Sequence, residues 1–354
     1  MSGDGIKRRE FIGGMAALSI APVGGMAGGE VTNSTRSNAN ATNFDGGAEV
    51  GKKGEMPYRM LGKTGVQVSC IGLGGFHLGT AQLTDTEMVK LFHAAVDRGI
   101  NFSDNCWDYN GGESERRVGK ALQGGYREKV FVMTKFDGRT KAAALKQLDE
   151  SLSRLAVDTI DLWQFHENIR LEDPDRFFAE GGAAEAVADA KKAGKIRFAG
   201  FTGHKDPSVH LRMLEMAEKY NFSFDAAQMP LNVMDAHFRS FATEVLPVLV
   251  RKQIGVLGMK SMGAGIILRS NTVSALECLQ YALSLPTSVV ITGIASMDHL
   301  EQAFTAAKTY SALSKADIAG ILAKTTVAAA NGRYELFKTS PMFDGTAQHP
   351  EWLG

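Results

Sequence analysis

The chain of 354 residues carries 39 basic and 39 acidic side chains, which gives no reason to expect nucleic acid or an acidic membrane surface as a partner. With 44% hydrophobic residues it can bury a large core, and its length suits one large barrel or two smaller domains. The cysteines Cys70, Cys106 and Cys278 lie far apart and are odd in number, which fits neither a disulfide framework nor the close ligand pairs of a zinc site. We therefore expect buried thiols and no metal site.

The first 55 residues do not have the pattern of a folded domain. Lys7-Arg8-Arg9-Glu10-Phe11-Ile12 opens a modest apolar stretch that resembles a twin-arginine export signal ending at the small residues before Gly28. We predict a signal peptide over residues 1–27 and a flexible linker over residues 28–55, which are rich in Gly, Asn, Ser and Thr.

A signal of this kind implies the twin-arginine export machinery as a partner and a periplasmic or cell-surface location. The alternative is an accidental arginine pair before a disordered tail, which would leave the protein in the cytoplasm. The apolar stretch is too short for a convincing membrane span, and we expect none later in the chain.

From Met56 the pattern alternates regularly between strands and helices. Short apolar runs predict strands at Val68–Leu73, Ile100–Ser103, Val130–Lys135, Ile160–His166, Ile196–Phe201, Ala226–Met229, Gly255–Met259 and Ser288–Thr292. Apolar residues at helical spacing predict helices at Thr84–Arg98, Ser114–Leu122, Lys141–Leu155, Ala183–Ala193, Pro207–Tyr220, Phe241–Lys252, Val273–Leu283 and Met297–Tyr310.

Eight strands alternating with eight helices predict a closed parallel (β/α)8 TIM barrel. An open doubly wound sheet is the alternative, but no Gly-x-Gly-x-x-Gly follows the first predicted strand. The stretch Ser314–Lys338 predicts an extra C-terminal helical segment packed on the barrel. The barrel domain would then span residues 56–339, followed by a C-terminal tail over residues 340–354.

Four polar side chains fall where consecutive predicted strands end. Asp104 and Tyr109 follow the second strand, Lys135 ends the third and His166 ends the fourth. Each has an ordinary explanation alone: a helix cap, a packing aromatic, a lysine reaching solvent and a satisfied core histidine. Together, at one end of a barrel, they predict a group that handles protons, because barrel enzymes keep their chemistry at the carboxyl ends of the strands.

The motifs around these residues resemble those of the aldo-keto reductase family. They are Gly99-Ile-Asn-Phe-Ser-Asp104, Tyr109-Asn-Gly-Gly-Glu-Ser-Glu115, Val132-Met-Thr-Lys135, Ile160-Asp-Leu-Trp-Gln-Phe-His166 and Gly194-Lys-Ile-Arg-Phe-Ala-Gly200. The resemblance runs from about Tyr58 to about Tyr310. It implies a barrel that binds a nicotinamide cofactor without a Rossmann motif.

By this resemblance the chain reduces an aldehyde or ketone, or oxidises the alcohol, by hydride transfer. Tyr109 would donate the proton, and Lys135 beside it would favour the phenolate by its charge. Asp104 would hold Lys135 in place, and His166 would orient the substrate oxygen.

The resemblance also predicts the cofactor NADP(H), although the usual arginine for a 2′-phosphate is missing and Ala303 stands where an asparagine is common. The expected cofactor-binding residues are Gly75, Thr202, Gln228, Met259, Lys260, Ser261, Gly293, Ser296 and His299. Phe76, His77 and Trp107 are candidates for the wall of a pocket that takes a small carbonyl or sugar-like substrate.

Two other functions fit a barrel of this kind. One is an aldolase that uses Lys135 as a Schiff-base nucleophile. The other is a cofactor-binding barrel without turnover. If the chain is exported, we expect it to fold around its cofactor and carry it out tightly bound.

Overall fold

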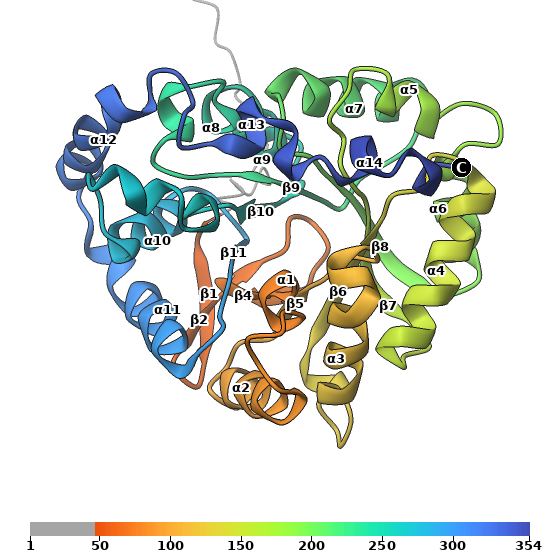
Figure 1. Cartoon of the computed structure of the whole chain (residues 1–354), viewed down its shortest axis with the longest axis horizontal. Helices are drawn as coiled ribbons and strands as arrows, with labels where there is room; N and C mark the ends of the chain where they lie inside the picture. The colour runs from red at the N-terminus through yellow and green to blue at the C-terminus, as the bar shows by residue number, and fades with distance from the viewer. Residues whose placement is uncertain (1–46) are drawn as a thin grey trace, which may run out of the picture. The chain divides into compact units, whose positions relative to one another are not determined.

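The computed structural model of the chain describes residues 47–354, and within them eight parallel strands close into a barrel (Figure 1). The strands are hydrogen-bonded in the order β4 (Ile71–Gly74), β5 (Phe102–Asp104), β6 (Phe131–Phe136), β7 (Ile160–Phe165), β8 (Ile196–Thr202), β9 (Ala226–Pro230), β10 (Gly255–Met259) and β11 (Val289–Thr292), which returns to β4. The predicted (β/α)8 barrel is confirmed. The predicted signal and residues 28–46 of the predicted linker lie outside the described residues.

The helices that connect the strands surround the barrel in Figure 1. They are α1 (Gly75–Leu78), α2 (Asp85–Asp97), α3 (Glu113–Ala121), α4 (Lys141–Leu155), α5 (Asp173–Phe177), α6 (Ala183–Lys192), α7 (Pro207–Lys219), α8 (Phe241–Glu244), α9 (Leu246–Arg251), α10 (Ala275–Ser284) and α11 (Met297–Thr309). In α2, Thr84 and Glu87 form a capping box, and the helix buries an apolar stripe that includes Leu91 and Phe92.

One predicted helix is divided. The pattern over Phe241–Lys252 predicts a single helix, whereas the structure has α8 and α9 separated by Val245. Pro247 lies in the first turn of α9, where a missing backbone N–H is tolerated, and it would disrupt the interior of one continuous helix.

A small antiparallel sheet precedes the barrel and consists of β1 (Glu49–Lys53), β2 (Met56–Met60) and β3 (Gln67–Ser69). The predicted strand Val68–Leu73 is therefore two strands, because the chain leaves this sheet at Ser69 and enters the barrel at Ile71. Leu61 and Val68 are buried in one cluster with the inward-facing barrel residues Phe102 and Phe131, so the segment fills one end of the barrel interior.

The last part of the predicted linker is wrong. Residues 49–53 form β1, which pairs with β2, and Glu49 accepts a hydrogen bond of 2.8 Å from the Tyr310 hydroxyl. Every side chain of β1 is exposed, so the strand is held mainly by backbone hydrogen bonds to β2 and has no apolar pattern that the sequence could reveal.

The extra C-terminal helical segment is present, but it is interrupted. It consists of α12 (Lys315–Ala329), α13 (Leu336–Thr339) and α14 (Gly345–Gln348), and Gly332 has a left-handed φ of 68° in the turn between α12 and α13. The predicted tail over residues 340–354 is not a separate tail, because the Leu353 carbonyl accepts a 2.7 Å hydrogen bond from the Arg139 backbone and the Leu353 side chain is buried.

No helix among the described residues is long and apolar enough to cross a membrane.

A fully buried lysine anchors α13. The Lys338 ammonium donates to Asp235 and to the Phe238 carbonyl, both at 2.7 Å, and lies 3.1 Å from Glu335. Replacing Lys338 with methionine keeps the apolar stem and leaves two carboxylates buried without their cation. We expect Lys338→Met to lower the free energy of unfolding by about 3–5 kcal/mol in urea denaturation.

Lys324→Met is the matched control, because Lys324 pairs with Glu277 through a half-exposed ammonium. It should lower the free energy of unfolding by no more than about 1 kcal/mol. Equal losses in the two variants would contradict the anchoring role of Lys338.

Candidate active site

The carboxyl ends of β5, β6 and β7 place four polar side chains at one end of the barrel. Asp104 ends β5, Lys135 lies in β6, His166 directly follows β7, and Tyr109 begins a short turn after β5. These strands are neighbours in the barrel, so residues distant in the sequence meet. The structure brings together all four of the predicted catalytic residues.

Lys135 is the centre of this group. Its ammonium forms an ion pair with Asp104 and donates to the Asn105 carbonyl at 2.7 Å and to the Tyr109 hydroxyl at 3.2 Å. Both charged side chains are buried, so the pair compensates charges that would be costly alone. All three protons of the ammonium therefore have acceptors. To attack a carbonyl as the nucleophile of an aldolase, Lys135 would have to lose a proton and break its ion pair with Asp104.

The Tyr109 phenol is held more firmly in its neutral form than the sequence predicts. Burial raises the pKa of Tyr109 well above its ordinary value, and the negative charge of Asp104 raises it further. The expectation of a lowered pKa is therefore wrong in its net direction, although the Lys135 ammonium does donate to the phenol oxygen as expected. The phenol therefore keeps its proton, and its oxygen accepts a hydrogen bond from the Lys135 ammonium.

His166 meets a cluster of groups that the sequence reasoning missed. Its Nδ1 lies 2.8 Å from Asp137 Oδ1, 3.2 Å from Cys106 Sγ and 3.8 Å from Asp108 Oδ1. Burial lowers the pKa of His166, but the nearby carboxylates, Asp137 first, outweigh it and raise the pKa above its ordinary value. The Tyr109 and His166 rings meet edge to face with centroids 6.1 Å apart.

Two of the expected cofactor residues carry buried polar atoms without partners. Gln228 in β9 donates to Asp104 Oδ2 at 3.1 Å, which leaves its Oε1 without a hydrogen bond to any described residue. Thr202 at the end of β8 also has a buried hydroxyl that meets no partner in the described part of the chain. Buried polar atoms are normally satisfied, so these two are available to a polar ligand.

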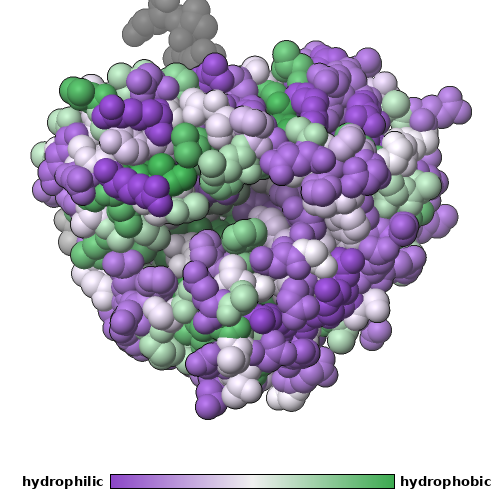
Figure 2. Space-filling model, in the orientation of Figure 1, coloured by the Kyte–Doolittle hydropathy of each residue, from purple (hydrophilic) through white to green (hydrophobic). Residues whose placement is uncertain are grey.

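A cavity of about 480 Å³ opens beside Tyr109 and Asp104. Figure 2 shows the corresponding face hollowed near its centre. Eight residues that the sequence predicted to bind the cofactor or form the pocket wall do line the cavity: Gly75, Phe76, His77, Met259, Lys260, Ser261, Gly293 and His299. They come from the end of β10 and from the segments that follow β4, β10 and β11, including α1 and the start of α11, so the cavity extends from the tyrosine across one side of the barrel mouth.

Close packing in this cavity requires glycine at two positions. A Cβ on Gly75 would lie 2.3 Å from the Asp104 carbonyl, and a Cβ on Gly293 would lie 2.4 Å from the His77 ring. At Gly75 and Gly293 the backbone therefore lies closer to the Asp104 carbonyl and to the His77 ring, respectively, than a residue with a Cβ would allow.

Four of the residues predicted to bind the cofactor or form the pocket wall do not line this cavity: Thr202, Gln228, Ser296 and Trp107. Ser296 caps α11 by accepting from the His299 backbone. The Trp107 indole donates to Glu150 at 2.6 Å and packs edge to face on Trp352 of the C-terminal segment.

Glu167, which follows His166, ties the C-terminal segment to the mouth of the barrel. It accepts hydrogen bonds from the Gly345 and Thr346 backbones at 2.8 and 2.6 Å. Glu167 has a φ of 45°, an unusual value for a residue with a side chain, and it lies beside the histidine. Asp344 extends the connection to His204 through a 3.1 Å contact.

The comparison with protein families agrees with this geometry. A model of the aldo/keto reductase family matches residues 70–277, which is more than half of the chain. The chain belongs to the aldo/keto reductase family.

Several aldo/keto reductases and dehydrogenases are similar in sequence. The 6-dehydroglucose reductase of Novosphingobium aromaticivorans is 34% identical over 159 residues, which cover 40% of this chain and 50% of that protein. The L-galactose dehydrogenase of Arabidopsis thaliana is 30% identical over 220 residues, or 59% of this chain and 66% of that protein. The chain thus matches half to just under two thirds of the length of these two relatives.

Solved aldo/keto reductases share the fold. The holo form of an aldo-keto reductase from Bacillus halodurans superimposes with a TM-score of 0.63 at 22% identity, and covers 79% of this chain and 99% of that chain. A thermostable aldo-keto reductase in complex with the inhibitor epalrestat gives a TM-score of 0.60 at 22% identity, and covers 75% and 99% of the two chains.

Proposed function

We propose that this aldo/keto reductase is an NADP(H)-dependent oxidoreductase that reduces an aldehyde or ketone, or oxidises the alcohol, with Tyr109 as the proton donor. The observation that carries the proposal is the Tyr109 hydroxyl, which lies 3.2 Å from the ammonium of the buried Lys135–Asp104 pair beside a cavity. A carbonyl oxygen placed against that hydroxyl would receive its proton.

The residues present fit a nicotinamide cofactor. When bound, NADPH supplies the hydride for carbonyl reduction. The Thr202 hydroxyl, which has no partner among the described residues, can donate to the oxygen of a carboxamide. The equally unpartnered Gln228 Oε1 can accept from its NH2 group. Lys260 offers a cation on the cavity wall, with its ammonium 4.4 Å from the centre of the Phe343 ring.

Three side chains have separate roles in the transfer of the proton to the substrate. Tyr109 stays protonated until a developing alkoxide takes its proton, because burial and Asp104 raise its pKa. Lys135 already donates to the phenol oxygen, so it stabilises the phenolate that forms. His166 bonds to the protein through Nδ1, which leaves Nε2 to orient the substrate oxygen.

The relatives support a sugar-like substrate as part of the proposal. Two of them are called 6-dehydroglucose reductase and L-galactose dehydrogenase.

Replacement of Tyr109 with phenylalanine tests the proton donor. Tyr109→Phe removes one oxygen atom and should lower kcat for reduction of an aldehyde panel by about 10²–10⁴-fold. Quenching of protein fluorescence by NADPH should be unchanged. Tyr220→Phe, which alters an exposed tyrosine, should leave both quantities at the wild-type level. Wild-type turnover in Tyr109→Phe would refute the assignment.

Lys260 gives a pH dependence for cofactor binding. Burial and then the charge of Lys135 lower the pKa of Lys260 to about 8. A phosphate needs the charged ammonium, so NADPH affinity should be constant below this pKa and decline as the pH rises through it. Fluorescence titration from about pH 6.5 to about pH 9.5 measures the profile.

Lys260→Met should weaken NADPH binding at low pH and flatten the profile. Lys315→Met, at an exposed lysine that begins α12, should keep the wild-type profile. A decline of the same size in Lys260→Met would show that another group controls affinity.

We further propose that the chain is exported by the twin-arginine route with NADP(H) already bound, since Arg8-Arg9 precedes a cofactor-binding barrel. Fractionation of cells followed by absorbance and mass analysis of the exported protein tests this. The expected result is processed protein that retains about one NADP(H). Protein confined to the cytoplasm, or exported without cofactor, would count against export in the loaded form.

A further inference from the structure

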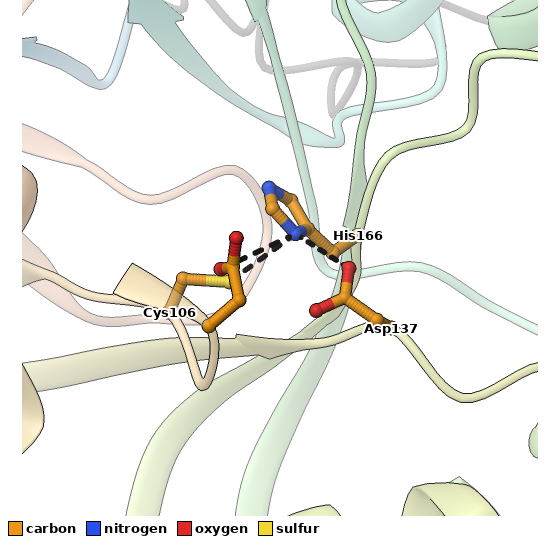
Figure 3. Close-up of side chains that lie close together, drawn as sticks. Cys106, Asp137 and His166 are labelled. Atoms are coloured by element: carbon orange, nitrogen blue, oxygen red, sulfur yellow. Dashed lines mark hydrogen bonds and ion pairs between the residues drawn. The ribbon is translucent and has the colours of Figure 1, made fainter. Parts of the chain in front are cut away.

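Cys106, Asp108, Asp137 and His166 form a cluster of donor groups, here called the Cys106 cluster. One ligand atom from each residue can be chosen so that all of them lie within 4.8 Å of one another. The residues come from the loops that follow β5, β6 and β7, and Figure 3 shows Cys106 and Asp137 meeting His166 at the same ring nitrogen. Thiolate, carboxylate and imidazole are the donors that zinc uses in proteins.

The spacing is close to that of a four-coordinate metal site. Zinc bonds to sulfur at about 2.3 Å and to nitrogen or oxygen at about 2.0–2.2 Å, so tetrahedral ligands lie about 3.3–3.7 Å apart. Around His166 Nδ1 the observed separations are 2.8 Å to Asp137, 3.2 Å to Cys106 and 3.8 Å to Asp108. These three separations bracket the tetrahedral range, and side-chain rotation would draw the four ligand atoms, which lie within 4.8 Å of one another, around one ion.

The charge balance of the cluster is unusual for this protein. The other buried acidic side chains in the described residues pair with lysine or arginine, except Glu167, which accepts two backbone N–H groups. The Asp137 carboxylate is buried, and His166 is its only ion-pair partner among the described residues. A second carboxylate, Asp108, has the same histidine as its sole ionic partner in residues 47–354. Buried carboxylates without a lysine or arginine are expected to be paired or to coordinate a metal.

One oxygen of Asp137 is left over. Its Oδ2 is buried and makes no hydrogen bond to any described residue. In Figure 3 this second oxygen is directed to the side on which Cys106 lies, inside the cluster. A buried carboxylate oxygen without a partner is free to ligate an ion.

The backbone of the cluster is fixed in advance. Arg139, itself ion-paired with Asp173, donates to the carbonyls of Asp137 and His166 at 2.7 and 3.1 Å. Gln147 accepts from the Asp137 backbone at 2.8 Å. Supporting hydrogen bonds of this kind hold ligands in place around protein metal sites.

We propose that the Cys106 cluster binds a divalent transition metal ion, with Zn²⁺ favoured by its mixture of sulfur, nitrogen and oxygen donors. Ligation through Nδ1 fixes the His166 tautomer, so Nε2 carries a proton and faces away from the cluster (Figure 3). The ion would thus position His166 as a hydrogen-bond donor. The proposal goes beyond the proposed function, because it is tested by metal binding without any measurement of turnover.

The test uses the untagged full chain, so that no polyhistidine tag competes for metal. After removal of metal with a chelator, Zn²⁺ is added back, the protein is dialysed and the metal is counted by mass spectrometry, with about one ion per chain expected. Co²⁺ in place of Zn²⁺ should give a thiolate-to-cobalt charge-transfer band in the near ultraviolet, since Cys106 supplies a sulfur ligand.

Cys106→Ser should abolish that band and weaken Zn²⁺ binding by at least about tenfold. Cys278→Ser replaces a buried thiol outside the cluster and should retain the band and the affinity. Absence of the band in the wild type, its survival in Cys106→Ser or its loss in Cys278→Ser would each overturn the proposal. If circular dichroism shows that Cys106→Ser does not fold, Asp137→Asn replaces it, and unchanged Zn²⁺ affinity in that variant would overturn the proposal equally.

Discussion

The mouth of this barrel depends on the buried ion pair between Asp104 and Lys135. Both charged side chains are almost fully buried, so each requires the other. The second oxygen of Asp104 accepts from Gln228, and the ammonium also donates to the Asn105 carbonyl. The pair therefore links β5 and β6 to β9 on another part of the barrel wall. Its ammonium also donates to the Tyr109 hydroxyl.

Similar pairs hold the segments that surround the mouth. Lys338 fastens α13 through Asp235, and Arg139 joins Asp173 while it supports the backbone beside His166. In each case a long cationic side chain reaches several acceptors in a dry interior, where hydrogen bonds to charge are strong. These links explain how loops and a C-terminal segment, which lack the regularity of strands, still keep a defined geometry beside the cavity.

The surroundings of His166 follow a different rule. Its neighbours are carboxylates and a thiol, and the positive charge that would balance them is not supplied by lysine or arginine among the described residues. Perturbed groups of this kind are concentrated at functional sites, where chemistry outweighs stability. The charge of Asp104 beside Tyr109 is balanced by a lysine, whereas that of Asp137 beside His166 is balanced by neither lysine nor arginine, although the two carboxylates lie at the ends of adjacent strands.

The sequence alone determined the barrel and the four residues at its mouth, because apolar runs, helical spacing and residues at strand ends are local patterns. It predicted the ranges of β10 and α4 as the structure has them. It did not reveal β1, whose exposed side chains leave no pattern, or the break before α9.

Only the tertiary structure decided how the site is surrounded. Asp137 lies two residues after the predicted strand Val130–Lys135, which is the available sequence signal, yet its contact with His166 depends on the register of β6 against β7. The folding of residues 340–354 onto Glu167 and Arg139, and the effect of burial on the pKa of Tyr109, likewise depend on contacts between distant segments. Local sequence fixes which residues end each strand, whereas desolvation and long-range pairing arise when the barrel closes.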